Sequence, residues 1–104
     1  MRNRTKRKSL EEITSILRQH LPELRERYGV KLLGVFGSYV HEQERSGSDL
    51  DLLVEFDDRP LTLLDFVRLE NHLSDLLGLK VDLVEKAALK PAIGRRILEE
   101  VQAV

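Results

Sequence analysis

Two carboxylates and a glycine-serine pair are the part of this sequence best suited to chemistry. Asp49 and Asp51 flank Leu50 at the start of one apolar run. Gly37 and Ser38 end an earlier run, and ten residues lie between Ser38 and Asp49. Side chains two residues apart on a strand point to the same side, so the two carboxylates would share one small volume. Like charges that close need a cation between them, and hard oxygen ligands suit Mg²⁺. The pattern therefore predicts a metal and phosphate site.

Gly37 and Ser38 predict an anion site at the end of a strand. Glycine lets the backbone approach a phosphate closely, and a helix that starts after the pair would add partial positive charge. Taken alone, such a pair is by default an ordinary turn, and Ser48 with Asp49 fits a capped turn. Asp51 fits that simpler interpretation less well, because Asp is depleted in strands and no basic residue lies near it in the sequence.

A third carboxylate, Asp82, lies inside the apolar segment of residues 81–84. If this segment pairs with the strand that contains Asp51, three acids converge on one edge of the sheet and could hold two metal ions about 4 Å apart. For nucleotidyl transfer, such ions neutralise a triphosphate and align the attacking and leaving oxygens. One acid can also help to deprotonate a hydroxyl.

Helical and strand patterns alternate along the chain and must position these residues. Apolar residues recur at helical spacing after the capping box of Ser9 and Glu12, and the same spacing returns between Thr62 and Gly78. The predicted helices are residues 9–20 with a new turn from Pro22, 38–44, 62–77 and 92–101, and the predicted strands are 30–36, 50–56 and 80–84. This order predicts an α/β (α+β) domain in which a small mixed three-stranded sheet is covered by about four helices.

Length and charge limit the function further. A chain of 104 residues is enough for one core, so we expect residues 9–104 to form a single domain and any acceptor to arrive on another chain. The first eight residues hold five basic side chains and predict a flexible basic tail. The other residues hold 12 of the 17 basic side chains and all 18 acidic ones, which argues against nucleic acid as a partner.

Absences exclude other classes of function. No apolar run approaches the roughly 20 residues that a bilayer requires, and no signal-peptide pattern follows the basic start, so we expect a cytoplasmic protein with no membrane partner. The sequence has no cysteine, which excludes disulfides and cysteine-based zinc sites. His20, His41 and His72 lack metal-binding spacing and are expected at the surface, as is Glu70.

Taken together, these residues resemble the minimal nucleotidyltransferase (MNT) members of the DNA polymerase β superfamily. The resemblance extends from the first predicted helix to the end of the chain, and the glycine-serine pair, the ten-residue spacer and the three acids carry it. It implies a nucleotidyltransferase fold in which Gly37 and Ser38 bind the triphosphate. It also implies that Asp49, Asp51 and Asp82 are catalytic ligands of Mg²⁺, two ions in all, with Asp82 either a metal ligand or a general base toward the acceptor hydroxyl.

The same resemblance implies a biological role. Small MNT proteins commonly pair with HEPN-domain ribonuclease toxins, so the resemblance implies an antitoxin that transfers AMP from ATP to a tyrosine hydroxyl of a toxin encoded by a neighbouring gene. The alternative is a catalytically weak or inactive binding module that neutralises its partner by occlusion, and an apolar helix face also allows a homo-oligomer. His41 and Glu42 stand where many relatives have an Arg-Gly pair, so a positive residue that would help to hold the nucleotide is missing.

Overall fold

The computed structural model describes residues 9–37, 49–58 and 61–104. Its elements are α1 (Leu10–Tyr28), β1 (Val30–Phe36), β2 (Leu50–Phe56), α2 (Leu63–Leu77), β3 (Val81–Glu85), the 3₁₀ helix η2 (Lys86–Ala88), α3 (Pro91–Glu100) and β4 (Gln102–Ala103). The sheet has the order β3-β2-β1-β4, with β2 and β3 parallel and the other pairs antiparallel. This confirms the predicted α/β class. The predicted basic tail and the predicted helix of residues 38–44 lie outside the described residues, as do Ser38, His41 and Glu42.

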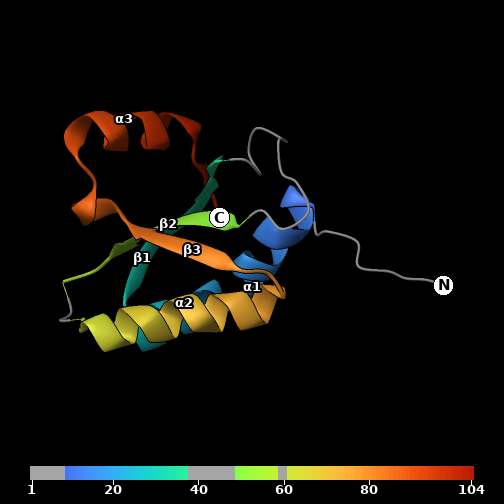
Figure 1. Cartoon of the computed structure of the whole chain (residues 1–104). Coiled ribbons are helices and arrows are strands. Elements are labelled where there is room, and N and C mark those ends of the chain that lie inside the picture. Colours follow the sequence, from blue (N-terminus) through green and yellow to red (C-terminus); the bar gives the residue numbers. More distant parts are fainter. Residues whose placement is uncertain (1–8, 38–48, 59–60) are drawn as a thin grey trace.

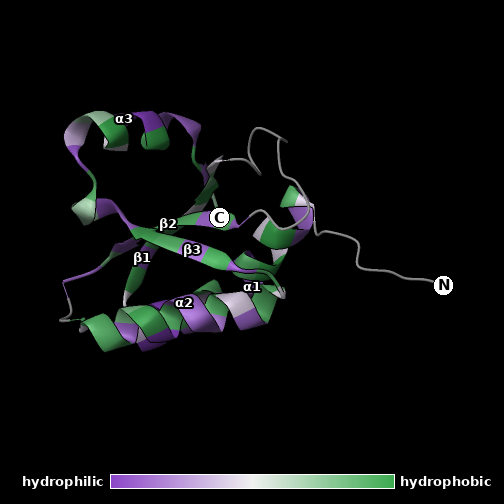
Figure 2. Cartoon of the chain, viewed as in Figure 1, coloured by the Kyte–Doolittle hydropathy of each residue, from purple (hydrophilic) through white to green (hydrophobic). Residues whose placement is uncertain are grey.

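Two helices cover one face of the sheet, and one helix lies over the other face (Figure 1). The strands are mainly hydrophobic, whereas the helices have mixed surfaces (Figure 2). The fully buried side chains of the core between α1, α2 and the sheet are Ile13, Leu17, Leu24, Val35, Leu50, Leu52, Val54, Leu69, Leu73 and Leu77. Only Gly94 of α3 is buried, so this helix covers its face of the sheet incompletely. No helix in the described ranges has the length and apolar character needed to cross a bilayer.

Both long helices begin with a capping box. In α1 the Glu12 N–H donates to Ser9 Oγ at 3.1 Å, and the Ser9 N–H donates to Glu12 Oε1 at 3.2 Å. In α2 the Asp65 N–H donates to Thr62 Oγ1 at 3.1 Å, and the Thr62 N–H donates to Asp65 Oδ2 at 3.3 Å. Such caps satisfy amides that have no partner inside the helix, and they set where each helix starts.

The first helix is longer than predicted, because α1 continues through Pro22 instead of ending near His20. A proline inside a helix destabilises it by about 3 kcal/mol. Beyond residue 20, however, Leu21, Leu24 and Tyr28 remain buried, and each buried large apolar side chain stabilises the fold by roughly 1.5–3 kcal/mol. Packing of the continued apolar stripe therefore outweighs the effect of the proline.

The fourth strand, β4, was not predicted, because its two residues are exposed and follow no pattern. It pairs with Gly34 and Val35 of β1, and the Val104 N–H donates to the Leu33 carbonyl oxygen at 2.9 Å. A Cβ atom on Gly34 would lie 2.5 Å from Val101 Cγ2. Only glycine at this position lets the C-terminal segment come so close to β1.

The predicted surface position of His72 holds only in part, because the residue is half-buried. Its ring packs against α1, with its centroid 6.0 Å from that of Tyr28. Its Nε2 atom is buried and has no hydrogen-bond partner among the described residues. His20 is also partly exposed, with 38% of its side chain accessible, and its Nδ1 atom lies 3.7 Å from Glu23 Oε1.

Replacing His72 with Leu should stabilise the fold. A buried polar atom without a partner destabilises a protein by about 1–3 kcal/mol, and leucine keeps the apolar contact while removing the unpaired nitrogen. We expect the free energy of unfolding to rise by about 1 kcal/mol, measured by urea denaturation at neutral pH. His20 offers a control, because it has no buried unpaired nitrogen among the described residues, and His20→Leu should leave stability nearly unchanged. A loss of stability in His72→Leu would show that Nε2 is satisfied in solution.

Candidate active site

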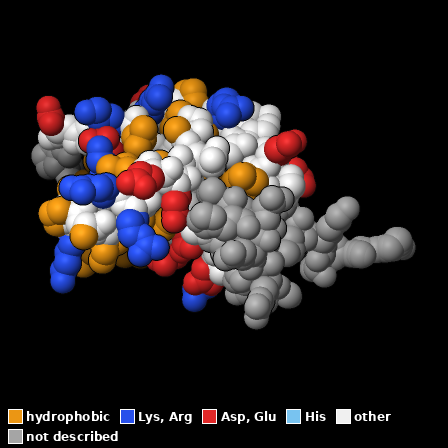
Figure 3. Space-filling model, turned by 90° about the horizontal axis from the view of Figure 1, so that it is seen from above, with side chains coloured by type: hydrophobic (Ala, Val, Ile, Leu, Met, Phe, Trp, Pro, Cys, Tyr) orange, Lys and Arg blue, Asp and Glu red, His pale blue; other side chains and the backbone are white. Residues whose placement is uncertain are grey.

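Asp51 and Asp82 lie side by side on the two parallel strands, where they are paired in register. Their neighbours Leu52 and Leu83 point into the core beneath α1 and α2, so the two carboxylates point to the opposite face, the side on which α3 lies. Acidic side chains gather near the middle of that face, and lysine and arginine side chains lie mainly toward the end occupied by α3 (Figure 3). The fold therefore brings two of the predicted acids together.

Asp49 lies one residue before β2 and has a cation beside it. Lys80 Nζ is 3.9 Å from Asp49 Oδ2, and the two side chains are 81% and 39% exposed, so the pair is loose and screened by solvent. The backbones of the two segments are tied more firmly, because the Leu50 N–H donates to the Lys80 carbonyl oxygen at 2.9 Å. Within the described residues, Asp51 and Asp82 form no ion pair.

The three carboxylates are close enough to affect one another. Burial raises the pKa of the Asp51 carboxyl above its ordinary value, and the charges of Asp82 and Asp49 raise that pKa further. A raised pKa means that the ionised form is disfavoured, so the site holds negative charge that is not fully compensated. A divalent cation would relieve this repulsion.

Gly37 follows β1 and lies directly against Asp51. Its neighbour Phe36 is the register partner of Asp51 across the antiparallel pair. The φ angle of Gly37 is +81°, in the left-handed region, and a Cβ atom there would collide with the Asp51 carboxylate. Both the backbone conformation and the available space therefore require glycine. The close approach seen here is to the Asp51 carboxylate, and the triphosphate site expected at Gly37 stays a prediction.

The donor set suits magnesium, although the acids are not gathered around one point. The described ranges contain no group of three or more His, Asp or Glu side chains that could hold a metal ion. Asp51 and Asp82 are adjacent, whereas Asp49 lies beside Lys80. All donors are hard oxygens, and the repulsion around Asp51 is of the kind that a divalent cation offsets. The residues therefore fit Mg²⁺ in their chemistry.

The predicted surface position of Glu70 also holds only in part, because the residue is half-buried and bonded to β3. Glu70 Oε2 accepts the Leu83 N–H at 2.9 Å, and Ser74 Oγ accepts the Val81 N–H at 3.1 Å. These two amides flank Asp82 in β3. Sequence reasoning missed the pair because its partners are backbone groups of another element. The available signal was two polar side chains at i, i+4 spacing on a helix that ends shortly before a strand.

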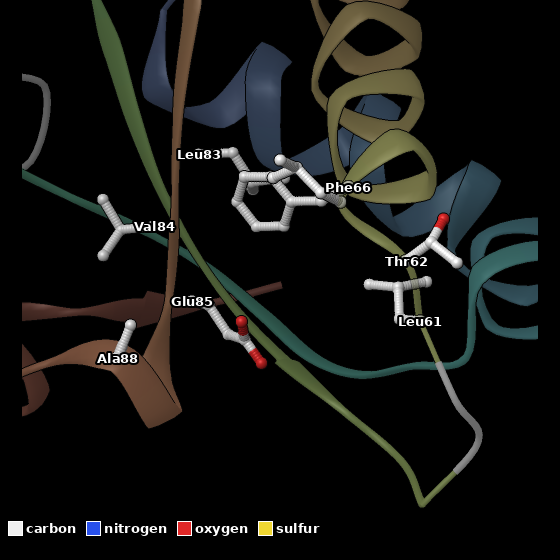
Figure 4. A pocket seen from close by; sticks show the side chains of 8 residues that line it. Leu61, Thr62, Phe66, Leu83, Val84, Glu85 and Ala88 are labelled. Carbon is white, nitrogen blue, oxygen red and sulfur yellow. The ribbon is translucent and has the colours of Figure 1, made fainter.

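Two pockets lie away from the three carboxylates. One, of about 460 Å³, is lined by Leu61, Thr62, Leu63, Phe66, Leu83, Val84, Glu85 and Ala88. Phe66 lies close to Leu83 in this mainly apolar pocket, with the Glu85 carboxylate near the end of β3 (Figure 4). The other, of about 430 Å³, lies against α3 and includes Lys86, Lys90 and Arg95. Lys86 is engaged there, because its Nζ is 3.6 Å from Glu55 Oε1.

Comparison with known proteins defines the class to which this fold and site belong. The family model of the nucleotidyltransferase domain matches residues 17–104. The chain therefore belongs to the nucleotidyltransferase domain family, and it is an enzyme of the minimal nucleotidyltransferase kind.

Individual relatives support this family membership. The protein adenylyltransferase MntA of Thermococcus cleftensis is 54% identical over 93 residues, which are 89% of this chain and 93% of the relative. A solved structure described as a minimal nucleotidyltransferase is 37% identical, with a TM-score of 0.78, and the match covers 93% of this chain and 97% of that one. The complex of a tri-AMPylated HEPN toxin of Shewanella oneidensis with its MNT antitoxin shares the fold, with a TM-score of 0.64 at 20% identity over 88% of this chain and 70% of that one.

Proposed function

We propose that this chain is a cytoplasmic, Mg²⁺-dependent antitoxin that transfers AMP from ATP to a tyrosine hydroxyl of a HEPN-domain toxin. The observation that carries the proposal is the in-register pair of Asp51 and Asp82 beside the left-handed Gly37. The identity of 54% to a protein adenylyltransferase supports a protein acceptor. Structures that share the fold support the choice of partner and nucleotide, since one contains an AMPylated HEPN toxin and another is a toxin-antitoxin complex with AMP-PNP.

All three acids are proposed metal ligands, and Asp82 has a further proposed role. Asp49, Asp51 and Asp82 are the residues that would hold Mg²⁺, which supplies positive charge to a bound triphosphate. Gly37 has no side chain, so the Asp51 carboxylate can lie directly against its backbone. Asp82 is exposed whereas Asp51 is half-buried, so Asp82 is the carboxylate that an incoming hydroxyl can reach.

The transfer step needs only ATP, the tyrosine hydroxyl and a carboxylate of the site. The tyrosine oxygen forms a bond to the α-phosphorus of ATP, and the bond between that phosphorus and the pyrophosphate oxygen breaks. The hydroxyl proton passes to a carboxylate acting as general base, for which the exposed Asp82 is the candidate. The products are an AMP-tyrosine ester and pyrophosphate.

The proposal is tested with ATP labelled in its α-phosphate, Mg²⁺, this chain and the HEPN protein encoded by the neighbouring gene. We expect label on the toxin, none when EDTA removes the metal, and none when the toxin tyrosine is replaced with phenylalanine. The double variant Asp49→Asn, Asp51→Asn should neither label nor neutralise the toxin. Full neutralisation by the double variant would instead favour inhibition by occlusion.

A further inference from the structure

β3 carries Asp82 and is an edge strand, since among the described elements only β2 pairs with it. In a parallel pair, alternate residues direct their backbone groups toward the partner strand. The Lys80 carbonyl oxygen accepts the Leu50 N–H of β2, so Val81 and Leu83 direct their amides to the outer edge. Both residues are buried, at 4% and 5% exposure. A buried amide without a partner would destabilise the fold.

Two side chains of α2 occupy that outer edge. Ser74 Oγ accepts the Val81 N–H at 3.1 Å, and Glu70 Oε2 accepts the Leu83 N–H at 2.9 Å. Their spacing matches the strand, because four helical residues rise about 6.0 Å and two residues of a parallel strand span about 6.6 Å. The helix runs opposite to β3, so the earlier side chain meets the later amide. The pair thus holds β3 at two points, one on each side of Asp82.

Asp51 and Asp82 lie on strands that are held in place differently. β2 is held by β1 on one side and β3 on the other, so Asp51 is fixed by strand pairing on both sides. Asp82 has strand pairing on one side only, and the bonds from Glu70 and Ser74 replace the missing strand. A rotation of β3 about its own axis would change the position of the Asp82 carboxylate relative to Asp51.

We infer that Glu70 and Ser74 are positioning residues that orient Asp82 toward Asp51, an inference that rests on the function proposed above. Both act through the backbone of β3, at its outer edge. Glu70 is the more important of the two, because a carboxylate accepts a stronger hydrogen bond than a hydroxyl does.

Three variants test this role. Glu70→Met removes the acceptor and keeps the side-chain length, Glu70→Gln keeps an oxygen that can accept the Leu83 N–H, and Ser74→Ala removes the weaker bond. We expect Glu70→Met to lower kcat for AMP transfer by about 10–100-fold, as small displacements of catalytic groups do, while KM for ATP changes less than about threefold. Glu70→Gln should restore kcat to within about threefold of the original value. Ser74→Ala should have an intermediate effect.

Asp65→Ala is the matched control, because it removes the capping box of the same helix without touching β3. It should lower the melting temperature as Glu70→Met does and leave kcat unchanged. An equal loss of kcat in both variants, at equal loss of stability, would overturn the positioning role. The positioning role would also be overturned if Glu70→Gln kept the hydrogen bond from the Leu83 N–H but did not restore kcat.

A measurement without nucleotide separates this inference from the proposed function. Amide hydrogen exchange followed by NMR should show faster exchange at Leu83 in Glu70→Met, with a shifted Asp82 signal and unchanged exchange at Val35 of β1. Unchanged exchange at Leu83 would overturn the inference, whatever the activity. Absence of AMP transfer by the unsubstituted chain would overturn only the proposed function. Loss of transfer in Asp82→Asn but not in Glu70→Met would overturn only the inference.

Discussion

Asp51→Asn is expected to lower AMP transfer by about a thousandfold, because it removes the carboxylate that lies against Gly37 and on which the charges of both other acids act. Asn has nearly the same shape, so the loss reflects charge and not packing. The rate of label transfer from ATP to the toxin measures it. Asp58→Asn is a suitable control, since Asp58 is exposed beyond the far end of β2, and it should transfer AMP normally. Normal transfer by Asp51→Asn would contradict the site assignment.

The same substitution should stabilise the folded chain at neutral pH in the absence of metal. Burial and the charges of Asp82 and Asp49 raise the folded-state pKa of Asp51 above its ordinary value of 3.8. The stability linked to protonated Asp51 is fully present below that ordinary value and is lost as the pH rises through the higher folded-state pKa. Asn does not ionise and is spared this loss.

Urea denaturation at several pH values, with EDTA present, would measure this effect. The stability advantage of Asp51→Asn over the unsubstituted chain should be small near pH 3 and should grow toward pH 7. Asp58→Asn should show no such trend. An Asp51→Asn chain that is less stable at pH 7 would mean that the carboxylate is stabilised in the fold, in conflict with the repulsion inferred here.

Gly37→Ala is the second large effect that the structure predicts. The left-handed backbone of Gly37 disfavours alanine by about 1–2 kcal/mol, and the added Cβ atom would push the Asp51 carboxylate out of place. We expect kcat for AMP transfer to fall by about a hundredfold or more, because displacement of a catalytic group by about 1 Å is enough for that. Thermal denaturation and the transfer assay, run on the same samples, measure the two losses.

Gly29→Ala distinguishes the effect of the left-handed backbone from the effect of contact with Asp51. Gly29 has a similar φ angle of +72° but caps the end of α1, far along β1 from Asp51. It should lose stability to a similar extent and keep its kcat. Equal kcat values for the two alanine variants would show that contact with Asp51 has no part in catalysis.

Most strands of this fold could be predicted because their signals are local. The bounds of β1 and β2 agree with the predicted residues 30–36 and 50–56, since each is an apolar run bounded by turn residues or acids. The start of α2 after Thr62 and its end before Gly78 agree as well. In each case propensity, capping and burial favour the same structure.

The parts that could not be predicted depend on contacts between distant segments. β4 exists because Gly34 admits the C-terminal residues, which no pattern in residues 102–103 reveals. Glu70 has the spacing of an exposed helical residue, and its true partner is an amide thirteen positions away. The pairing of Asp51 with Asp82 was predicted only on the condition that their strands are neighbours. That condition is a matter of topology, which the sheet order supplies.

The outer backbone groups of β3 and of β1 are covered in different ways, which bears on aggregation. Side chains of α2 shield β3, whereas β1 is screened on its outer side by the short β4. Bare strand margins act as templates on which other polypeptides assemble. Residues 102–104 cover part of the outer side of β1 in this way, and the absent side chain of Gly34 leaves the space for them. We therefore expect Gly34→Ala to aggregate more readily than the unsubstituted chain.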